Sequence, residues 1–175
     1  MKRRNRFATL LVLALATATV AVISGSAGAS PAPENAFGTR AEHLTEQRTL
    51  LFQQAFEQRD LATLSTLLAP AATLVYPFTS YGTDDPETRY TGEEQVLAYF
   101  RQVFTVMGRI KFVDEKLSVV AVGQTSFLQA NGDFTTVDGR PYRNVYVFRL
   151  DWNHGHVVSI EEYADPIKYS NTFPN

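Results

Sequence analysis

The spacing of hydrophobic residues changes near the middle of this chain, from a helical period to the alternation typical of β-strands. Residues 41–58 repeat hydrophobic side chains every three or four positions, which predicts an amphipathic helix. Asp60 is a suitable N-cap for a short second helix, and Pro70 should end that helix. The hydrophobic stripes of the two helices consist of Leu44, Leu51, Phe52, Ala55 and Phe56, and of Leu61, Leu64, Leu67 and Leu68.

A strand, a polar loop and a third helix are predicted next. Residues 73–78 favour a strand, and residues 79–90 favour a long loop of the kind that can cover a pocket. Thr91 and Glu94 form a capping-box pattern, which predicts that a helix begins there. The core-facing residues of this helix are Val96, Phe100, Val103, Phe104 and Met107.

The rest of the chain predicts β-structure, because short alternating runs are separated by turn residues. Helices followed by an antiparallel meander indicate an α+β fold with the helices on one face of the sheet. A strongly curved sheet would enclose a pocket, whereas a flat sheet would leave a filled core, and periodicity fits both. The expected strands are 110–122, 125–137, 141–152 and 156–164, with turns at Gly123, Asp138-Gly139 and 153–155.

The N-terminus has the pattern of a bacterial secretory signal peptide. Four basic residues precede an uncharged, mainly apolar run at 7–23, and Ala27-Gly28-Ala29 fits a cleavage site. The 17-residue run is near the lower limit for a membrane span, so an uncleaved anchor is the alternative. The cleavage motif favours removal after Ala29, by the general or the twin-arginine route. The expected organisation is a leader at 1–29, a linker at 30–38 and one domain at 39–175.

Composition narrows the classes of partner. The four basic residues of the leader account for the difference between a net charge of −2 for the whole chain and −6 for residues 30–175. An acidic domain without basic clusters is a poor candidate for binding nucleic acid or, once the leader is removed, an anionic membrane. The chain contains no cysteine, which excludes disulfides. We therefore expect a secreted domain that binds neither nucleic acid nor an anionic membrane.

The last predicted hairpin contains an acid in an unusual place. Alternation puts Val158, Ile160 and Glu162 on one face, and a carboxyl group in line with aliphatic residues requires an explanation. The alternative is that Glu162 faces solvent, as most strand acids do. His154 and His156 lie in the expected hairpin turn, and the three histidines of the chain have no metal-binding spacing. We predict no metal and no cofactor.

Three segments resemble known families. Residues 142–146 (Tyr-Arg-Asn-Val-Tyr) and 160–166 (Ile-Glu-Glu-Tyr-Ala-Asp-Pro) resemble the phenazine biosynthesis A/B proteins, and residues 72–77 resemble the first strand of ketosteroid isomerases. Together with the order of elements, they identify the domain as similar to the SnoaL-like branch of the nuclear transport factor 2-like superfamily. The resemblance implies a cone-shaped α+β barrel with an internal pocket for an apolar small molecule, usually as a homodimer.

Two activities of this superfamily lack their residues here. Ketosteroid isomerases carry an aspartate where this chain has Tyr76, and a tyrosine where it has Phe52, so we reject that activity. Limonene epoxide hydrolases carry an Arg-x-Asp pair, which the alignment places at Gln129 and Asn131. Amides can orient a water molecule but cannot accept its proton. Epoxide hydrolysis would therefore depend on Glu162 alone.

The remaining resemblance, to phenazine A/B proteins and SnoaL-like polyketide cyclases, implies that Glu162 is a general acid or base. Tyr76, Asn144, Tyr146, Gln129 and Asn131 are the candidate substrate-binding residues. The expected function is acid–base cyclisation or isomerisation of an apolar, polyketide-like metabolite. The alternatives are a binding protein that sequesters a hydrophobic ligand without catalysis, and an interaction protein whose cavity is filled by core residues.

Overall fold

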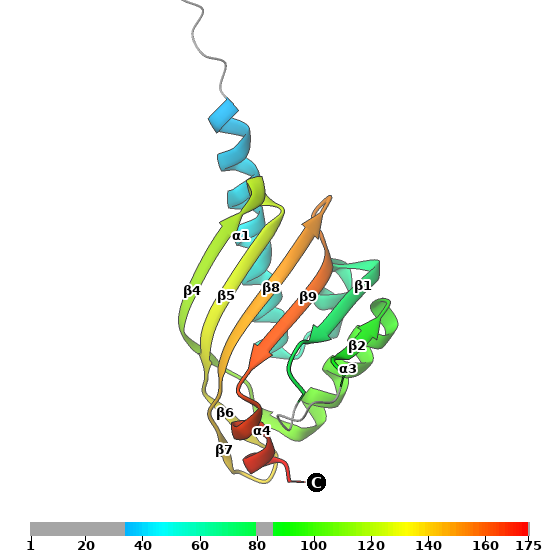
Figure 1. Ribbon diagram of the computed structural model, residues 1–175, viewed down its shortest axis with the longest axis vertical. Coiled ribbons are helices and arrows are strands. Elements are labelled where there is room, and N and C mark those ends of the chain that lie inside the picture. Colours follow the sequence, from blue (N-terminus) through cyan, green and yellow to red (C-terminus); the bar gives the residue numbers. More distant parts are fainter. Residues whose placement is uncertain (1–33, 80–85, 175) are drawn as a thin grey trace, which may run out of the picture. The chain divides into compact units, whose positions relative to one another are not determined.

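A computed structural model describes residues 34–79 and 86–174 (Figure 1). The predicted leader and its cleavage site lie outside these residues. The helix expected from residue 41 begins at Glu34, so part of the expected linker is helical. No helix within the two described ranges is long and apolar enough to cross a membrane.

The helices are α1 (Glu34–Gln58), α2 (Leu61–Leu67), α3 (Glu93–Val106) and α4 (Pro166–Thr172), with a short 3-10 turn at Ala121–Gly123. The strands are β1 (Leu68–Tyr76), β2 (Thr88–Thr91), β3 (Met107–Arg109), β4 (Phe112–Val120), β5 (Thr125–Gly132), β6 (Phe134–Thr136), β7 (Pro141–Tyr142), β8 (Val145–Asn153) and β9 (His156–Ala164).

Six strands form a curved sheet in the order β2-β1-β9-β8-β5-β4, with α1 behind it in Figure 1. This arrangement confirms the predicted α+β class. Two details differ from the expected antiparallel barrel: β1 pairs with β9 in parallel, and β2 and β4 are free edges, so the sheet does not close. The parallel pair joins the first strand of the chain to the last strand of the large sheet.

The two strands predicted at 125–137 and 141–152 are each interrupted. Gly132 ends β5, and Asp133 at the break forms ion pairs with Arg109 and Arg143. Beyond the break, β6 pairs with β3 on one side and with β7 on the other, in a separate three-stranded sheet. This second sheet lies at the end of the fold where α4 is found (Figure 1).

Three local predictions are corrected. Pro70 lies within β1, at an irregularity in its pairing with β9, where a proline without an N–H group is tolerated. Strand β2 occupies the end of the predicted loop, whereas residues 80–85 of that loop lie outside the described residues. Helix α3 is capped by Gly92 with φ 86° instead of Thr91, and the side chain of Gln95 accepts a hydrogen bond from the Thr91 N–H group.

The hydrophobic core has two parts. One part joins α1, α2 and α3 to the inner face of β1, β8 and β9, and Leu64, Val96 and Ile160 are almost completely buried within it. The other part lies where the two sheets meet and consists largely of aromatic rings, including Phe112 and Phe134. The second part is not close-packed throughout, and a cavity opens beside it.

Candidate functional site

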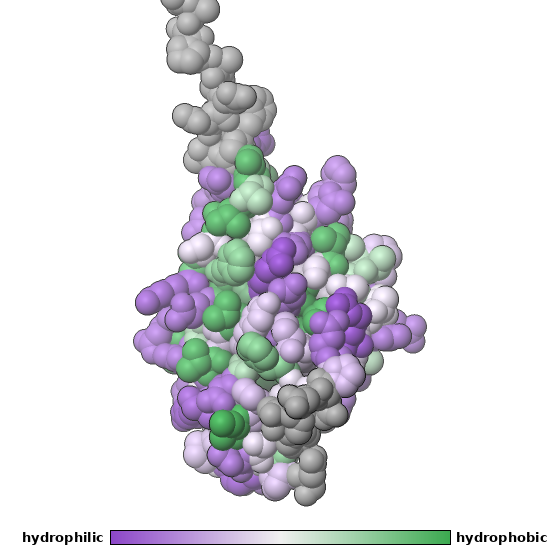
Figure 2. Space-filling model, in the orientation of Figure 1, coloured by the Kyte–Doolittle hydropathy of each residue, from purple (hydrophilic) through white to green (hydrophobic). Residues whose placement is uncertain are grey.

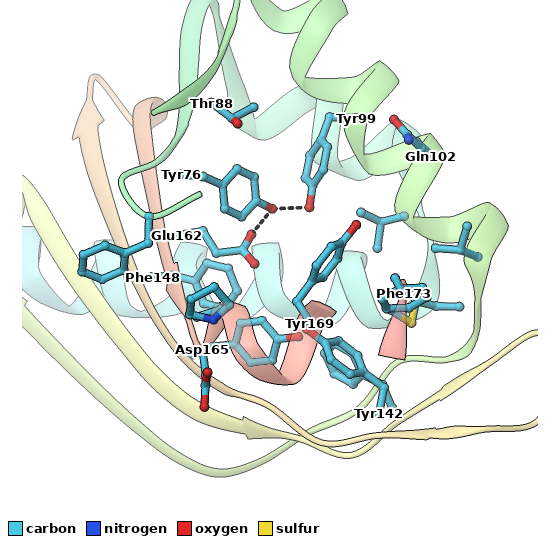
Figure 3. Close-up of a pocket in the computed structure, with 18 of the residues that line it drawn as sticks. Tyr76, Thr88, Tyr99, Gln102, Tyr142, Phe148, Glu162, Asp165, Tyr169 and Phe173 are labelled. Atoms are coloured by element: carbon cyan, nitrogen blue, oxygen red, sulfur yellow. Dashed lines mark hydrogen bonds between the residues drawn. The ribbon is translucent and has the colours of Figure 1, made fainter. Parts of the chain in front are cut away.

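The cavity lies between the inner face of the large sheet, α3 and α4 (Figure 3). Its volume is about 220 Å³, so it is not filled by Phe100, Phe104 and Met107, as the interaction-protein alternative required. Twelve of its 22 lining residues are aromatic. Six are tyrosines, namely Tyr76, Tyr90, Tyr99, Tyr142, Tyr146 and Tyr169, and six are phenylalanines, namely Phe56, Phe78, Phe112, Phe134, Phe148 and Phe173.

Glu162 borders this cavity from β9. Its strand partner Phe148 also lines the cavity, and the next inward residue of β9, Ile160, is buried in the core. Glu161 points to the outer face, where it accepts hydrogen bonds from Tyr163 and Arg149. One of the three residues predicted to face inward, Val158, does not do so. An irregularity in the β8–β9 pairing buries Val157 in its place.

Hydrogen bonds join Glu162 to two tyrosines. The Tyr76 hydroxyl donates to Glu162 Oε2 at 2.6 Å, and the Tyr76 and Tyr99 hydroxyls are hydrogen-bonded to each other (Figure 3). The ring of Tyr99 also lies against that of Tyr90, with centroids 4.8 Å apart. These side chains come from β9, β1, α3 and β2, so the network around the carboxyl group joins four separate elements.

Burial changes the acidity of this group. Loss of hydration raises the pKa of Glu162 to about 7, although the hydrogen bond from Tyr76 acts in the opposite direction. Burial, together with the nearby Glu162 carboxyl, also raises the pKa values of Tyr76 and Tyr99 well above their ordinary range. The tyrosines therefore remain neutral donors, while Glu162 can gain or lose a proton near neutral pH.

Tyr146 occupies the other part of the cavity wall, as a predicted substrate-binding residue should. Its hydroxyl is hydrogen-bonded to that of Tyr142, and its ring stacks against Phe148 with centroids 5.5 Å apart. A side chain at Gly132 would place its Cβ only 2.8 Å from the Tyr146 ring. The glycine at the end of β5 therefore makes room for this ring at the bend of the sheet.

Asn144 does not line the cavity, in contrast to the prediction. Its side chain is buried, and it donates to the Tyr142 hydroxyl and to the backbone carbonyl of Asp165. Its Oδ1 accepts from the backbone N–H groups of Val145 and Asp165. All of these partners belong to the protein, so Asn144 fixes the start of β8 to the end of β9, next to the cavity.

Gln129 and Asn131 also lie outside the cavity. Both are exposed, whereas Leu128 and Ala130, which alternate with them along β5, are buried. Strand alternation therefore turns the two amides to the outer face of the sheet, and Asn131 donates a hydrogen bond to Asp114 there. The alignment with epoxide hydrolases had placed them in the pocket.

Several site residues were not predicted. Tyr99 lies three positions after Val96 and four before Val103, which places it on the same face of α3. The helical spacing therefore predicts that Tyr99 points inward. Helix α4, which brings Tyr169 and Phe173 to the cavity, was also missed. Its signal was Asp165 followed by proline, because the Asp165 side chain caps the helix and proline suits the first helical position.

Within residues 34–79 and 86–174, no three acidic or histidine side chains are grouped closely enough to hold a metal ion. The side chains of the site provide one carboxyl group with a pKa near neutrality, several phenol groups and aromatic walls. This combination can transfer a proton and donate hydrogen bonds to an oxygen atom of a bound molecule.

The fold and this site agree with a family assignment. The family model of the SnoaL-like domain matches residues 50–160, and the chain belongs to that family. No curated protein matches the sequence.

Solved structures support the same fold at low sequence identity. A nuclear transport factor 2-like protein of unknown function from Burkholderia pseudomallei is 21% identical, with a TM-score of 0.64, covering 75% of this chain and 98% of that one. A phenazine biosynthesis-related protein from Pseudomonas aeruginosa is 8% identical with a TM-score of 0.64, covering 77% and 87%. A protein proposed to be a polyketide cyclase, from Xanthomonas campestris, is 14% identical with a TM-score of 0.58, covering 71% and 93%.

Proposed function

We propose that this protein binds a small metabolite in the aromatic cavity and catalyses its cyclisation or isomerisation, with Glu162 as general acid and base. The observation that carries the proposal is the Glu162 carboxyl group, which is partly buried among aromatic rings and hydrogen-bonded to Tyr76. General acid–base groups are most effective when their pKa lies near the working pH, and the pKa of Glu162 is raised to about 7. The polyketide cyclase proposed for the Xanthomonas structure makes an apolar, carbonyl-containing substrate a reasonable class.

In the proposed reaction, the ionised carboxyl of Glu162 removes a proton from carbon next to a carbonyl group. The electron pair of that C–H bond moves towards the carbonyl oxygen and forms an enolate. A neutral phenol group donates a hydrogen bond to this oxygen, for which the Tyr142–Tyr146 pair in the cavity wall is suited. Glu162 then returns its proton to another carbon, which shifts the double bond, or to an oxygen formed by ring closure.

The arrangement of Tyr76 and Tyr99 suits this proton exchange. Tyr76 donates to Glu162 Oε2, which leaves Oε1 as the oxygen for the substrate proton. Tyr99 can in turn donate to Tyr76, because a hydroxyl group both donates and accepts. The two phenol groups thus hold one carboxyl oxygen and orient the other.

The base can be tested without knowing the natural substrate. With 5-nitrobenzisoxazole, a base removes the ring C–H proton while the N–O bond breaks, and a coloured cyano-nitrophenolate is released. We expect the rate to rise with pH through about 7 and to fall about 100-fold or more in Glu162→Gln. Glu161→Gln is the matched control, since that carboxyl group is on the outer face. An unchanged rate in Glu162→Gln would refute the assignment.

A second candidate is a binding protein without catalytic activity. It is favoured by the absence of a second acid or base pointing into the cavity from the described residues, since Asp165 caps α4 and points away from the cavity (Figure 3). Native mass spectrometry of the purified protein distinguishes the two. Retention of an unmodified metabolite over prolonged incubation favours binding, whereas its conversion, absent in Glu162→Gln, favours catalysis.

The proposal includes export and dimer formation. The leader pattern at residues 1–29 supports secretion with cleavage after Ala29, which N-terminal sequencing of the exported protein would test. Phe127 and Val145 are more than a third exposed on the outer face of the sheet, where Figure 2 shows hydrophobic and hydrophilic side chains intermixed. Such a face supports association with a second copy, and light scattering coupled to chromatography should give the mass of a dimer.

A further inference from the structure

The described residues of the cavity wall include acidic side chains but no basic ones. Among the 22 described lining residues there is no lysine, arginine or histidine, and the two acids are Glu162 and Asp165. Asp165 accepts hydrogen bonds from the backbone N–H groups of Ile167 and Lys168, and its carboxylate points away from the cavity (Figure 3). Glu162 is therefore the one acid of the described wall that faces the cavity.

A buried carboxylate is normally paired with a cation, because loss of hydration strongly destabilises an isolated charge. The hydrogen-bond partner of Glu162 is instead the neutral phenol group of Tyr76. A positively charged ligand would form an ion pair with the Glu162 carboxylate. A carboxylate or phosphate ligand would instead be repelled by Glu162, and the described wall has no basic side chain to offset that repulsion.

The aromatic wall favours the same class of ligand. The faces of tyrosine and phenylalanine rings attract alkylammonium groups, and cages of such rings are used to recognise quaternary ammonium ligands. Tyr76, Tyr90 and Tyr99 surround the carboxyl group on one side, and Phe148 lies beside it on the sheet. The cavity volume of about 220 Å³ is below the roughly 300–1,000 Å³ typical of drug-sized ligands. A compact ammonium compound would fit this space.

We propose that the cavity binds a small organic cation, an alkylated amine or ammonium compound, with Glu162 as its counterion and the surrounding rings as its cage. This inference rests on the proposed function, since it concerns the same site, but it assigns the substrate a positive charge in place of the apolar class suggested by the Xanthomonas structure. A cationic nitrogen next to the reacting carbon would also make its C–H bond more acidic, which suits removal of a proton by a carboxylate.

The pH dependence of binding follows from Glu162 alone near neutrality. The ionisable groups that face it are phenol groups, and burial raises the pKa values of the two nearest, Tyr76 and Tyr99, well above their ordinary range. Helix α1 contributes the non-ionisable Phe52, Gln53 and Phe56 around its inner side. None of the three histidines lines the cavity. The phenol groups are Tyr76 from β1, Tyr90 from β2, Tyr99 from α3, Tyr142 from β7, Tyr146 from β8 and Tyr169 from α4.

The experiment compares choline with its neutral carbon isostere, 3,3-dimethylbutan-1-ol, by calorimetry or ligand-observed NMR with the full domain. Choline carries a permanent charge, so any pH dependence belongs to the protein. At pH 8 choline should bind about tenfold more tightly than the isostere. Its affinity should fall about tenfold between pH 8 and pH 6, as the carboxyl group becomes protonated. Glu162→Gln should remove the preference, and Glu161→Gln should keep it.

The inference is overturned if choline binds no better than the alcohol at pH 8, if it does not bind, or if its preference survives in Glu162→Gln. The benzisoxazole assay separates this failure from failure of the proposed function, because its probe is neutral. Loss of choline binding with intact, Glu162-dependent proton removal would refute only the cationic ligand. Loss of both would refute the acid–base role as well.

Discussion

Replacement of Glu162 by glutamine should stabilise the folded protein at alkaline pH. The carboxyl group has an ordinary pKa of 4.5, and burial raises it to about 7 in the fold. The native state therefore binds this proton more tightly than the unfolded state. The resulting stabilisation is fully present below pH 4.5 and is lost as the pH rises through 7. Glutamine cannot ionise, and its side-chain oxygen can still accept the hydrogen bond from Tyr76.

The magnitude follows from the difference between the two pKa values. About 2.5 pH units correspond to about 3 kcal/mol of stability that the wild-type protein loses between pH 4.5 and pH 8 because of this one group. All other titrating groups are shared with the variant and cancel in the comparison. The stability of Glu162→Gln relative to the wild type should therefore increase by about 3 kcal/mol over this range.

Urea unfolding, followed by fluorescence, measures this difference. The single tryptophan, Trp152, is buried in the core and should report global unfolding. Glu161→Gln provides the control, because its carboxyl group lies on the outer face and should leave the pH dependence unchanged. If the difference between Glu162→Gln and the wild type stays constant within about 0.5 kcal/mol from pH 4.5 to pH 8, the reasoning about burial is wrong.

Two further substitutions test the surroundings of the carboxyl group. Tyr76→Phe removes a hydrogen bond to a carboxylate, worth about 1.5–3 kcal/mol, so the pKa of Glu162 should rise by about one to two pH units. A benzisoxazole pH–rate profile whose midpoint does not move would contradict this. Asn144→Ala leaves two backbone N–H groups without their acceptor and should destabilise the fold by about 2–4 kcal/mol in urea unfolding. Asn131→Ala, on the exposed outer face, should cost less than about 0.5 kcal/mol, and equal losses in the two variants would show that Asn144 has no special role.

The sequence contained enough information to predict the class of fold and the inward position of the acid. Alternation along the last hairpin separates Ile160 and Glu162 from Glu161, and the strand structure is regular at that point. The same alternation excludes Gln129 and Asn131 from the cavity, because they alternate with the buried residues Leu128 and Ala130.

Features that depend on breaks and on long-range pairing were not predictable in the same way. Asp133 interrupts a run that otherwise reads as one strand, and its two arginine partners are distant along the chain. The parallel pairing of β1 with β9 brings Tyr76 next to Glu162, although 86 positions separate them. Local periodicity contains no information about either contact, so the tyrosine–carboxyl network could be described only from the structure.

The most direct test of the central claim is a pH titration of the Glu162 carboxyl carbon by NMR, with ¹³C-labelled glutamate and the resonance assigned by its absence in Glu162→Gln. We predict a midpoint of about 7, because the carboxyl group is partly buried in the aromatic cavity without a basic partner among the described lining residues. A midpoint near the ordinary value of 4.5 would contradict it, since a carboxyl group hydrated in that way could not serve as the proposed acid and base at neutral pH.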